Sequence, residues 1–369
     1  MKFRCDRDAL SEALQTVQRS VSSRPGMPAL TGVLMEASEG GTLTLKTTDL
    51  EVSAEMSIEV QVQEAGRSLA PARLLGDIVK NLSIGQVEIE SDERSQAQIR
   101  SNSYEGTLRL LPAEDFPALQ EPQGTSIQLE AGRFAEAVTQ VGRAASKDEA
   151  RPILTGVLLE VSREGITMAA TDSYRLAVRE LTATASAEAK AVVPERALSE
   201  AGRAAGADEN AQVEVHIDES QVSFTVGAMR LTSRLIEGEF PNYRQLLPEG
   251  YENRLTMPRQ KLIEAVQRVG LLARENTPVR LEFNALGLRL SSQSPDLGQA
   301  VEAIEDAVYE GEDITVAFNP GYLADGLKAA TGDTVRLEVR DGLKPGVVHG
   351  DTDEFTYLVM PVRLPAPVG

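Results

Sequence analysis

Few residues in the chain could carry out covalent or metal-dependent chemistry. His216 and His349 are the only histidines, and Cys5 is the only cysteine. The histidines fall in strand-like segments far apart in the sequence, so we expect neither a metal pair nor a catalytic triad. Cys5 occupies a position that Leu129 and Met257 fill in similar segments, which indicates a small core residue. No phosphate-binding loop or GxGxxG sequence is present, and we therefore predict a protein that is not an enzyme and uses no metal or cofactor.

Two aspartates recur in matching positions, Asp49 after Thr48 and Asp172 after Thr171. Each pair stands at an expected turn, where a short polar side chain bonds to nearby backbone amides. We therefore predict that both aspartates cap turns and that neither acts as a general base.

Basic residues recur in register and could bind a polyanion by charge alone. Lys80, Arg203 and Lys328 each follow a matched leucine by the same spacing, away from the core side of three similar helices. The other candidates for this basic face are Arg19, Arg143 and Arg268 on the first helix of each segment, and Arg24, Arg73, Lys147, Arg151 and Arg196. The formal net charge is −19, so only such a shared basic face would let the chain contact a phosphate backbone, without reading bases.

These positions belong to three repeats of roughly 125 residues. Each repeat reads as a strand, a helix, several strands, a second helix and further strands. The first helices carry apolar stripes at helical spacing, namely Leu10, Leu14, Val17 and Val21, then Phe134, Val138, Val141 and Ala145, then Leu262, Val266, Val269 and Ala273. We predict an α+β fold of three similar domains, residues 1–122, 123–248 and 249–369, each with two helices packed against antiparallel sheets.

Composition restricts the class of protein further. Aromatic residues make up only 4% of the chain and Trp is absent, which disfavours the base-stacking platforms of single-strand-binding modules. No apolar run approaches the ~18 residues of a membrane span, and Met1–Asp6 reads as the start of a strand instead of a signal peptide. Together with the single cysteine, these features predict a cytoplasmic protein without a membrane partner.

Three longer motifs resemble a known family. They are Ala170–Val178 (ATDSYRLAV), Gly238–Arg244 (GEFPNYR) and Val359–Leu364 (VMPVRL). With the repeats, they make essentially the whole chain similar to the bacterial DNA polymerase III beta subunits, the DNA sliding clamps. The resemblance implies the DNA-clamp fold, with two chains closing head to tail into a homodimeric ring around duplex DNA of any sequence. An acidic exterior and a basic inner face would then coexist on one ring.

The same resemblance implies a processivity factor in DNA replication that tethers other proteins and performs no chemistry itself. The implied partners are the DNA polymerase III catalytic subunit, the clamp loader, and clamp-motif peptides of repair polymerases, ligase and mismatch-repair proteins. They would dock a short peptide in a hydrophobic pocket between the second and third domains.

Carried over position by position, the implied pocket has apolar residues that would hold peptide anchors and polar residues that would orient the peptide. Its members are Leu154, Thr171, Ser173, Tyr174, Arg175, Leu176, Pro241, Leu246, Asn319, Tyr322, Met360, Pro361, Val362 and Arg363. Without the resemblance, Leu154, Leu176 and Leu246 read more simply as core residues. Ser173 stands where some relatives have Gly, so we expect the peptide preference to differ in detail.

Ring closure would join the last strands of the first domain to the edge of the third. The candidate contacts are Leu108 and Leu110 on one side and Leu271 and Leu272 on the other, with Arg100 or Arg109 meeting Glu302 or Glu305. Edge strands that pair across chains would also satisfy backbone groups that are otherwise unpaired.

Two other interpretations stay open from the residues alone. The three repeats could form a scaffold that binds peptides but not DNA, or an enzyme with an unrecognised site, although the shortage of His and Cys argues against an enzyme. Neutralising Lys80, Arg203 and Lys328 together separates the clamp from the scaffold, because only a clamp would lose DNA retention.

Overall fold

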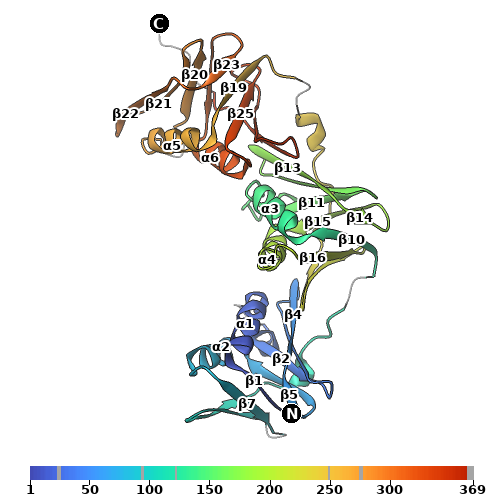
Figure 1. Ribbon diagram of the computed structural model, residues 1–369. Coiled ribbons are helices and arrows are strands. Elements are labelled where there is room, and N and C mark those ends of the chain that lie inside the picture. Colours follow the sequence, from blue (N-terminus) through green and yellow to red (C-terminus); the bar gives the residue numbers. More distant parts are fainter. Residues whose placement is uncertain (23–25, 93–94, 121–122, 248–249, 274–276, 364–369) are drawn as a thin grey trace. The chain divides into compact units, whose positions relative to one another are not determined.

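The computed structural model describes residues 1–22, 26–92, 95–120, 123–247, 250–273 and 277–363 (Figure 1). The chain forms two compact units, residues 1–132 with 203–235, and residues 133–202 with 236–369. The units cut across the three repeats, because strands of the second repeat pair with the first repeat in one sheet and with the third repeat in another.

The first unit holds two antiparallel sheets. One has the order β5-β1-β7-β8-β9, built from β1 (Lys2–Asp6), β5 (Gln61–Glu64), β7 (Gln86–Ser91), β8 (Gln96–Ser101) and β9 (Tyr104–Arg109). The other contains the run β10-β16-β17-β18-β4-β3-β2-β6, built from β2 (Gly32–Ala37), β3 (Thr42–Thr48), β4 (Val52–Glu59), β6 (Gly66–Pro71), β10 (Thr125–Glu130), β16 (Gln212–Ile217), β17 (Gln221–Val226) and β18 (Met229–Arg234). The first and second repeats meet in this sheet at β4 and β18, where Ala54 lies opposite Leu231.

Two helices of the first unit, α1 (Arg7–Val17) and α2 (Ala72–Asn81), pack against each other. α1 begins at Asp6, whose carboxylate accepts a hydrogen bond from the backbone amide of Asp8 at 2.9 Å. α2 begins directly after Pro71, its N-cap residue. Short 3-10 helices accompany the chain at η1 (Gln18–Ser20), η2 (Pro28–Thr31), η3 (Ala113–Asp115), η4 (Pro152–Thr155) and η5 (Tyr243–Leu246).

The second unit also holds two antiparallel sheets. The larger has the order β15-β11-β12-β13-β27-β26-β25-β19-β23, built from β11 (Gly156–Val161), β12 (Gly165–Thr171), β13 (Arg175–Thr182), β15 (Ala189–Pro194), β19 (Asn253–Pro258), β23 (Val308–Glu310), β25 (Thr334–Val339), β26 (Gly346–His349) and β27 (Phe355–Val359). The smaller has the order β22-β21-β20-β24, built from β20 (Val279–Asn284), β21 (Gly287–Ser294), β22 (Gly298–Ile304) and β24 (Ile314–Phe318), and β14 (Thr184–Ala185) is a short further strand. The second and third repeats meet at β13 and β27, where Arg175 lies opposite Val359.

The remaining helices are α3 (Ala131–Gly142), α4 (Glu195–Ala205), α5 (Arg259–Gly270) and α6 (Pro320–Ala329). α4 approaches α3 closely at Gly202, where an added Cβ would lie only 2.8 Å from the Val138 side chain. α5 packs on α6. The close contact at Gly202 explains why this helix tolerates a residue with poor helix propensity.

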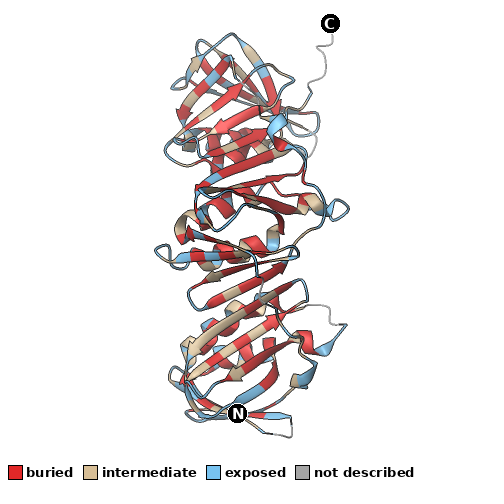
Figure 2. Ribbon diagram, turned by 90° about the vertical axis from the view of Figure 1, so that its right-hand side faces the viewer, coloured by how far each residue is buried: buried red, intermediate tan, exposed pale blue. Residues whose placement is uncertain are grey.

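Figure 2 shows buried residues concentrated on the strands and on one face of the helices. The predicted stripes of all three first helices are buried, with Ala273 alone only partly buried. Cys5 is buried as predicted. The combination of antiparallel sheets with helices packed against them confirms the predicted α+β class. Among the described residues, no helix has the length and apolar character needed to cross a membrane.

Candidate functional site

The turn that leads into β13 presents several of the predicted pocket residues. The Thr171 hydroxyl donates to the carbonyl of Arg175 (2.6 Å) and accepts from the Ser173 amide (3.1 Å). Asp172 Oδ1 accepts from the amides of Tyr174 (2.9 Å) and Arg175 (3.0 Å). These bonds hold Ser173 in the left-handed region at φ 80°. The predicted capping role of Asp172 is therefore confirmed, and the turn leaves the Tyr174 side chain exposed.

The first repeat builds the same turn. Asp49 Oδ1 accepts from the amides of Glu51 (3.1 Å) and Val52 (2.8 Å), and Leu50 has φ 78°. Val52, however, stands where the second repeat has Arg175. The first and second repeats thus share this turn, but of the two only the second has a cation at this position.

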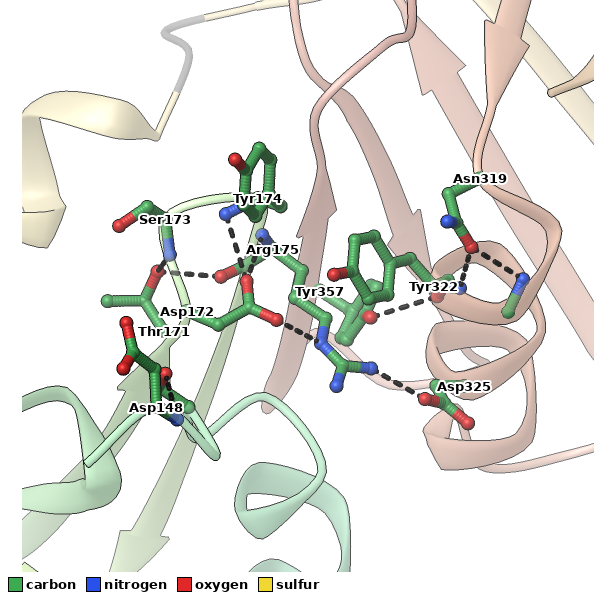
Figure 3. Close-up of polar contacts among 12 residues, drawn as sticks. Asp148, Thr171, Asp172, Ser173, Tyr174, Arg175, Asn319, Tyr322, Asp325 and Tyr357 are labelled. Atoms are coloured by element: carbon green, nitrogen blue, oxygen red, sulfur yellow. Dashed lines mark hydrogen bonds and ion pairs between the residues drawn. The ribbon is translucent and has the colours of Figure 1, made fainter. Parts of the chain in front are cut away.

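Arg175 is the centre of what we call the Arg175 cluster, which consists of Asp172, Arg175, Tyr322, Asp325 and Tyr357 (Figure 3). Arg175 Nε donates to Asp172 Oδ2 (2.9 Å) and Nη1 donates to Asp325 Oδ2 (2.5 Å). The guanidinium carbon lies 4.6 Å from the centroid of the Tyr322 ring. Burial lowers the pKa of Arg175, but its interactions with Tyr357 and the two carboxylates outweigh burial and raise that pKa above its ordinary value. The cluster therefore holds a permanent cation whose side chain is only 10% exposed.

Helix α6 supplies the other side of this cluster. Asn319 caps the helix by accepting from the amides of Gly321 (2.9 Å) and Tyr322 (3.2 Å). The Tyr357 hydroxyl donates to the Tyr322 carbonyl at 2.9 Å. The rings of Tyr174 and Tyr322 are stacked with centroids 6.2 Å apart. Aromatic surface from the second repeat and from the third therefore lies side by side next to Arg175, as Figure 3 shows.

The η5 segment is fastened to β11 by one carboxylate. Glu160 accepts from the Tyr243 hydroxyl (3.0 Å) and from Arg244 (2.5 Å). Burial raises the pKa of Glu160, but hydrogen bonds from Arg244, Lys190 and Tyr243 outweigh it and lower the pKa below its ordinary value. Leu246, at the end of this fixed segment, is exposed. It is therefore available for contact, unlike an ordinary core leucine.

Two other predicted pocket leucines are core residues. Leu154 and Leu176 are buried, and Leu176 belongs to a core cluster with Leu158 and Phe240. The core interpretation therefore holds for Leu154 and Leu176 and not for Leu246. Pro241, which directly follows Phe240 in the chain, is exposed.

The segment after β27 runs past the turn. The Met360 amide donates to the Tyr174 carbonyl (2.8 Å), and the Val362 amide donates to the Ala317 carbonyl (2.8 Å). Met360 and Arg363 are exposed, and Pro361 and Val362 are partly buried. These backbone bonds bring the predicted C-terminal residues beside Tyr174.

Sequence reasoning missed three members of the Arg175 cluster or their roles. Asp172 was predicted as a turn cap, but its second oxygen also pairs with Arg175. Tyr357 and Asp325 were not predicted at all. The recurrence of the Thr-Asp pair could have drawn attention to Asp172, whereas one acidic residue on α6 gives no signal among 56 acidic residues.

An exposed cation lies in the last turn of the second helix of each repeat. Lys80 on α2, Arg203 on α4 and Lys328 on α6 occupy this position. Their predicted register on the helices is confirmed. A cation at a helix C-terminus also interacts favourably with the helix dipole.

The predicted helical positions of Arg19 and Arg143 are wrong. Arg19 lies in the 3-10 turn η1, and Arg143 lies just beyond the end of α3. α1 tightens after Val17, whose carbonyl accepts a hydrogen bond from the Thr47 hydroxyl at 2.6 Å. α3 ends at Gly142, a residue with poor helix propensity. Both arginines are nevertheless exposed.

The other predicted basic residues differ in their surroundings. Arg268 on α5 pairs with Glu302 (2.6 Å) and Glu264 (3.6 Å). Arg151 contacts a residue of the predicted pocket, because its Nη1 donates to Ser173 Oγ at 3.1 Å. Arg73 on α2, Arg196 on α4 and Lys147 after α3 are exposed, and Arg24 lies outside the described residues.

The predicted interface residues are not equally accessible. Leu271 is 79% exposed, and Leu110 and Leu272 are partly buried. Leu108 is only 4% exposed, so in the single chain its side chain offers little surface for such a contact. β9 and β22 are nevertheless both edge strands of their sheets.

Two of the expected ion-pair partners are already engaged within the chain. Arg100 pairs with Glu88 (3.3 Å) and Glu90 (3.4 Å) across its own sheet. Glu302 pairs with Arg268 at 2.6 Å. A contact between Arg100 and Glu302 would first have to break these pairs.

The described part of the chain holds no group of three or more His, Cys, Asp or Glu side chains arranged for a metal ion. His216 and His349 lie on β16 and β26, in the strand contexts that the sequence predicts.

Comparisons with known proteins cover nearly the whole chain. Three family models match, the N-terminal, central and C-terminal domains of the DNA polymerase III beta subunit, at residues 1–120, 128–242 and 244–363. A beta sliding clamp from Streptomyces coelicolor is 39% identical, over 99% of this chain and 100% of the relative. The crystal structure of the sliding clamp from Bacillus subtilis is similar with a TM-score of 0.94 and 31% identity, covering 99% of this chain and 100% of that one. A Pseudomonas aeruginosa sliding clamp bound to griselimycin is similar with a TM-score of 0.94 and 30% identity, covering 99% and 100%.

Proposed function

The chain belongs to the family of the bacterial DNA polymerase III beta subunit, the non-catalytic sliding clamps of DNA replication, and from this membership we propose how its own residues act. Two chains close head to tail into a ring around duplex DNA. The ring tethers the replicative polymerase and other DNA-processing proteins through a pocket around the Arg175 cluster. We place this activity in the cytoplasm.

The observation that carries the DNA contact is the recurrence of Lys80, Arg203 and Lys328. Each is exposed in the last turn of the second helix of its repeat, in a chain of net charge −19. The helix dipole favours a cation anywhere in the last turn, whereas a phosphate backbone would meet the same charge at the same position on each repeat. Contacts to phosphates alone leave the energy nearly uniform along the duplex, so the ring can slide.

Ring closure is proposed through the edge strands β9 and β22. Unpaired backbone groups on both edges favour pairing with a second chain, and head-to-tail contacts close into a ring when the rotation allows. Leu271 and Leu272 offer apolar surface near this edge, and Leu110 the opposite surface. Replacing Leu272 with Asp should convert the dimer to a monomer in native mass spectrometry, and an intact dimer would exclude this interface.

The tethering role is proposed for the exposed aromatic and apolar side chains beside Arg175. Tyr174, Leu246 and Met360 are exposed, and Tyr322 is stacked on Tyr174. Such a surface fits a short peptide with apolar anchors, and the fixed cation would orient the peptide. Griselimycin is bound by clamps from Pseudomonas aeruginosa and Bartonella birtlesii, which supports a ligand pocket in this chain as well. The proposed partners are the polymerase III catalytic subunit, the clamp loader, repair polymerases, ligase and mismatch-repair proteins.

The decisive experiment loads the protein onto a nicked circular plasmid with a clamp loader and ATP, isolates the complex and then linearises the DNA. A ring should stay on the circle and leave the linear form. Retention on linear DNA would indicate ordinary affinity binding and overturn the sliding mechanism. A known clamp is loaded in parallel as a control. If the control loads and this protein does not, the result counts against the proposal.

A matched pair of triple variants separates the clamp from a peptide-binding scaffold. Replacing Lys80, Arg203 and Lys328 with Ala should lower the amount of protein that the clamp loader places on the circle and weaken the salt dependence of loading. The control replaces Arg67, Arg163 and Lys344, which are also exposed, also one per repeat and outside the predicted basic face. Equal loading by both variants would contradict the proposed role of these three cations.

A further inference from the structure

Two sets of residues with separate predicted roles meet at one carboxylate. Asp325 on α6 accepts from Arg175 Nη1 through Oδ2 at 2.5 Å. Its other oxygen, Oδ1, lies 3.8 Å from Arg143 Nη1. Arg175 belongs to the proposed pocket and Arg143 to the proposed DNA-facing set. Asp325 is therefore shared between them.

A second contact joins the same two sets. Arg151, also in the DNA-facing set, donates to the Ser173 hydroxyl at 3.1 Å and to Asp148 at 3.1 Å. Ser173 belongs to the turn that carries Arg175. The pocket and the basic residues of the second repeat are thus connected at two points.

The two ion pairs of Asp325 are unequal in strength. Its contact with Arg175 is short, and the Arg175 side chain is 10% exposed, so little water screens that pair. Its contact with Arg143 is longer, and both side chains are more than a third exposed, at 38% and 35%. A phosphate can therefore draw Arg143 away from Asp325 at small cost, whereas Arg175 stays in place.

Removing Arg143 changes what Asp325 does for Arg175. While Arg143 is nearby, it attracts the carboxylate and competes with Arg175 for it. Once Arg143 pairs with a phosphate, the carboxylate serves Arg175 alone and holds the guanidinium more firmly over the Tyr322 ring. A peptide that packs on this ordered surface then loses less freedom on binding.

We propose that Asp325 is a positioning residue through which DNA in the ring tightens peptide binding in the pocket. The inference rests on the proposed clamp function and adds an energetic link between its two sites. The coupling is reciprocal, so a bound peptide also strengthens the contact of Arg143 with DNA. Because the Arg143 pair is exposed and screened by salt, we expect about a two- to five-fold effect, which lies at and below the low end of typical couplings.

The test compares peptide affinity with and without DNA in the ring. Fluorescein-labelled griselimycin is titrated by anisotropy into free protein and into protein loaded on a nicked circular plasmid. The wild type should bind about two- to five-fold more tightly when loaded. Asp325→Asn should bind equally in both states, and Asp325→Glu should keep part of the difference. Asp333→Asn, an exposed aspartate just after α6 with the same charge change, should behave as the wild type.

Arg143→Ala gives a result of opposite sign that a merely structural role would not produce. It should raise the affinity of free protein for griselimycin to the loaded value, because the competing cation is gone. Arg143 is exposed beyond a helix end, so this variant is expected to fold even if Asp325→Asn does not.

Each outcome decides between the inference and the proposed function. Equal affinity of free and loaded wild type, or a difference that survives in Asp325→Asn, would overturn the coupling and leave the clamp function intact. Unchanged affinity of free Arg143→Ala would also overturn it. Failure of the wild type to bind griselimycin in either state, or to load where a known clamp loads, would instead count against the proposed function.

Discussion

Replacing Arg175 with Met tests whether the buried cation organises the Arg175 cluster. Met keeps much of the side-chain volume and removes the charge. Asp172, whose side chain is 12% exposed, would then lose its cation at 2.9 Å, while Asp325, at 35% exposure, could turn to water. Breaking a fully buried pair costs about 3–5 kcal/mol, so with one carboxylate partly hydrated we expect a loss of about 2–3 kcal/mol.

The assay is native-state hydrogen exchange at the amides of β13 and β27, since local opening of this unit is read there directly. The double variant Asp172→Asn with Arg175→Met should be less destabilised than Arg175→Met alone, because no unpaired charge stays buried. Arg268→Ala, which breaks an exposed pair with Glu302, is the control and should leave exchange in β13 unchanged. An Arg175→Met variant that exchanges like this control would refute the reasoning.

Three further predictions concern other parts of the chain. In a urea titration, Leu50→Gly should stabilise the first unit by about 1 kcal/mol, because φ 78° is strained for Leu. The control is Leu74→Gly, at an equally exposed leucine inside α2, which should destabilise the unit by about 1 kcal/mol. A loss of stability at both sites would contradict the strain argument. Burial raises the pKa of the Cys5 thiol to about 12, so Cys5 should resist alkylation by iodoacetamide at pH 8 until urea unfolds the protein, and rapid labelling of native protein would show an open core. The lowered pKa of Glu160 means that its stabilising contribution is present above its ordinary pKa of 4.5 and is lost as the pH falls through the folded value. The stability difference between wild type and Glu160→Gln should therefore shrink in acid, and a difference independent of pH would contradict that assignment.

Helix faces and turns were predictable because they depend on near neighbours. The stripe of Leu10, Leu14 and Val17 follows the helical period, and burial of all three confirms it. The Thr-Asp turn follows from bonds spanning only a few residues, as at Asp49 and Asp172. The register of the second helices was readable for the same reason.

Helix ends were less predictable. Arg19 and Arg143 keep the sequence register of a helix, but the α-helical backbone stops before both. At Val17 the helix carbonyl is taken by Thr47 from β3, a residue distant in sequence. A one-dimensional period carries no information about such a competitor.

Whether an individual leucine is buried or exposed depends on tertiary packing. Leu176 and Leu246 have the same chemistry, but the first lies in a core cluster and the second is exposed at the end of η5. Leu108 and Leu271 were both predicted as candidate interface residues, but in the single chain only Leu271 is exposed. Leu108 and Leu176 lie on strands and are buried, whereas Leu246 and Leu271 lie at the ends of helical segments and are exposed.

The sequence by itself determined the threefold repeat, the alternation of helices and strands, the register of the basic residues and the family. Those properties follow from local periodicity and from short motifs, which can be recognised without knowledge of the fold. Only the tertiary structure decided that β13 pairs with β27 and that Asp325 reaches Arg175 across a gap of 150 residues. Ion pairs of this kind form where packing of sheets and helices brings two side chains together, and no spacing along the chain specifies that distance.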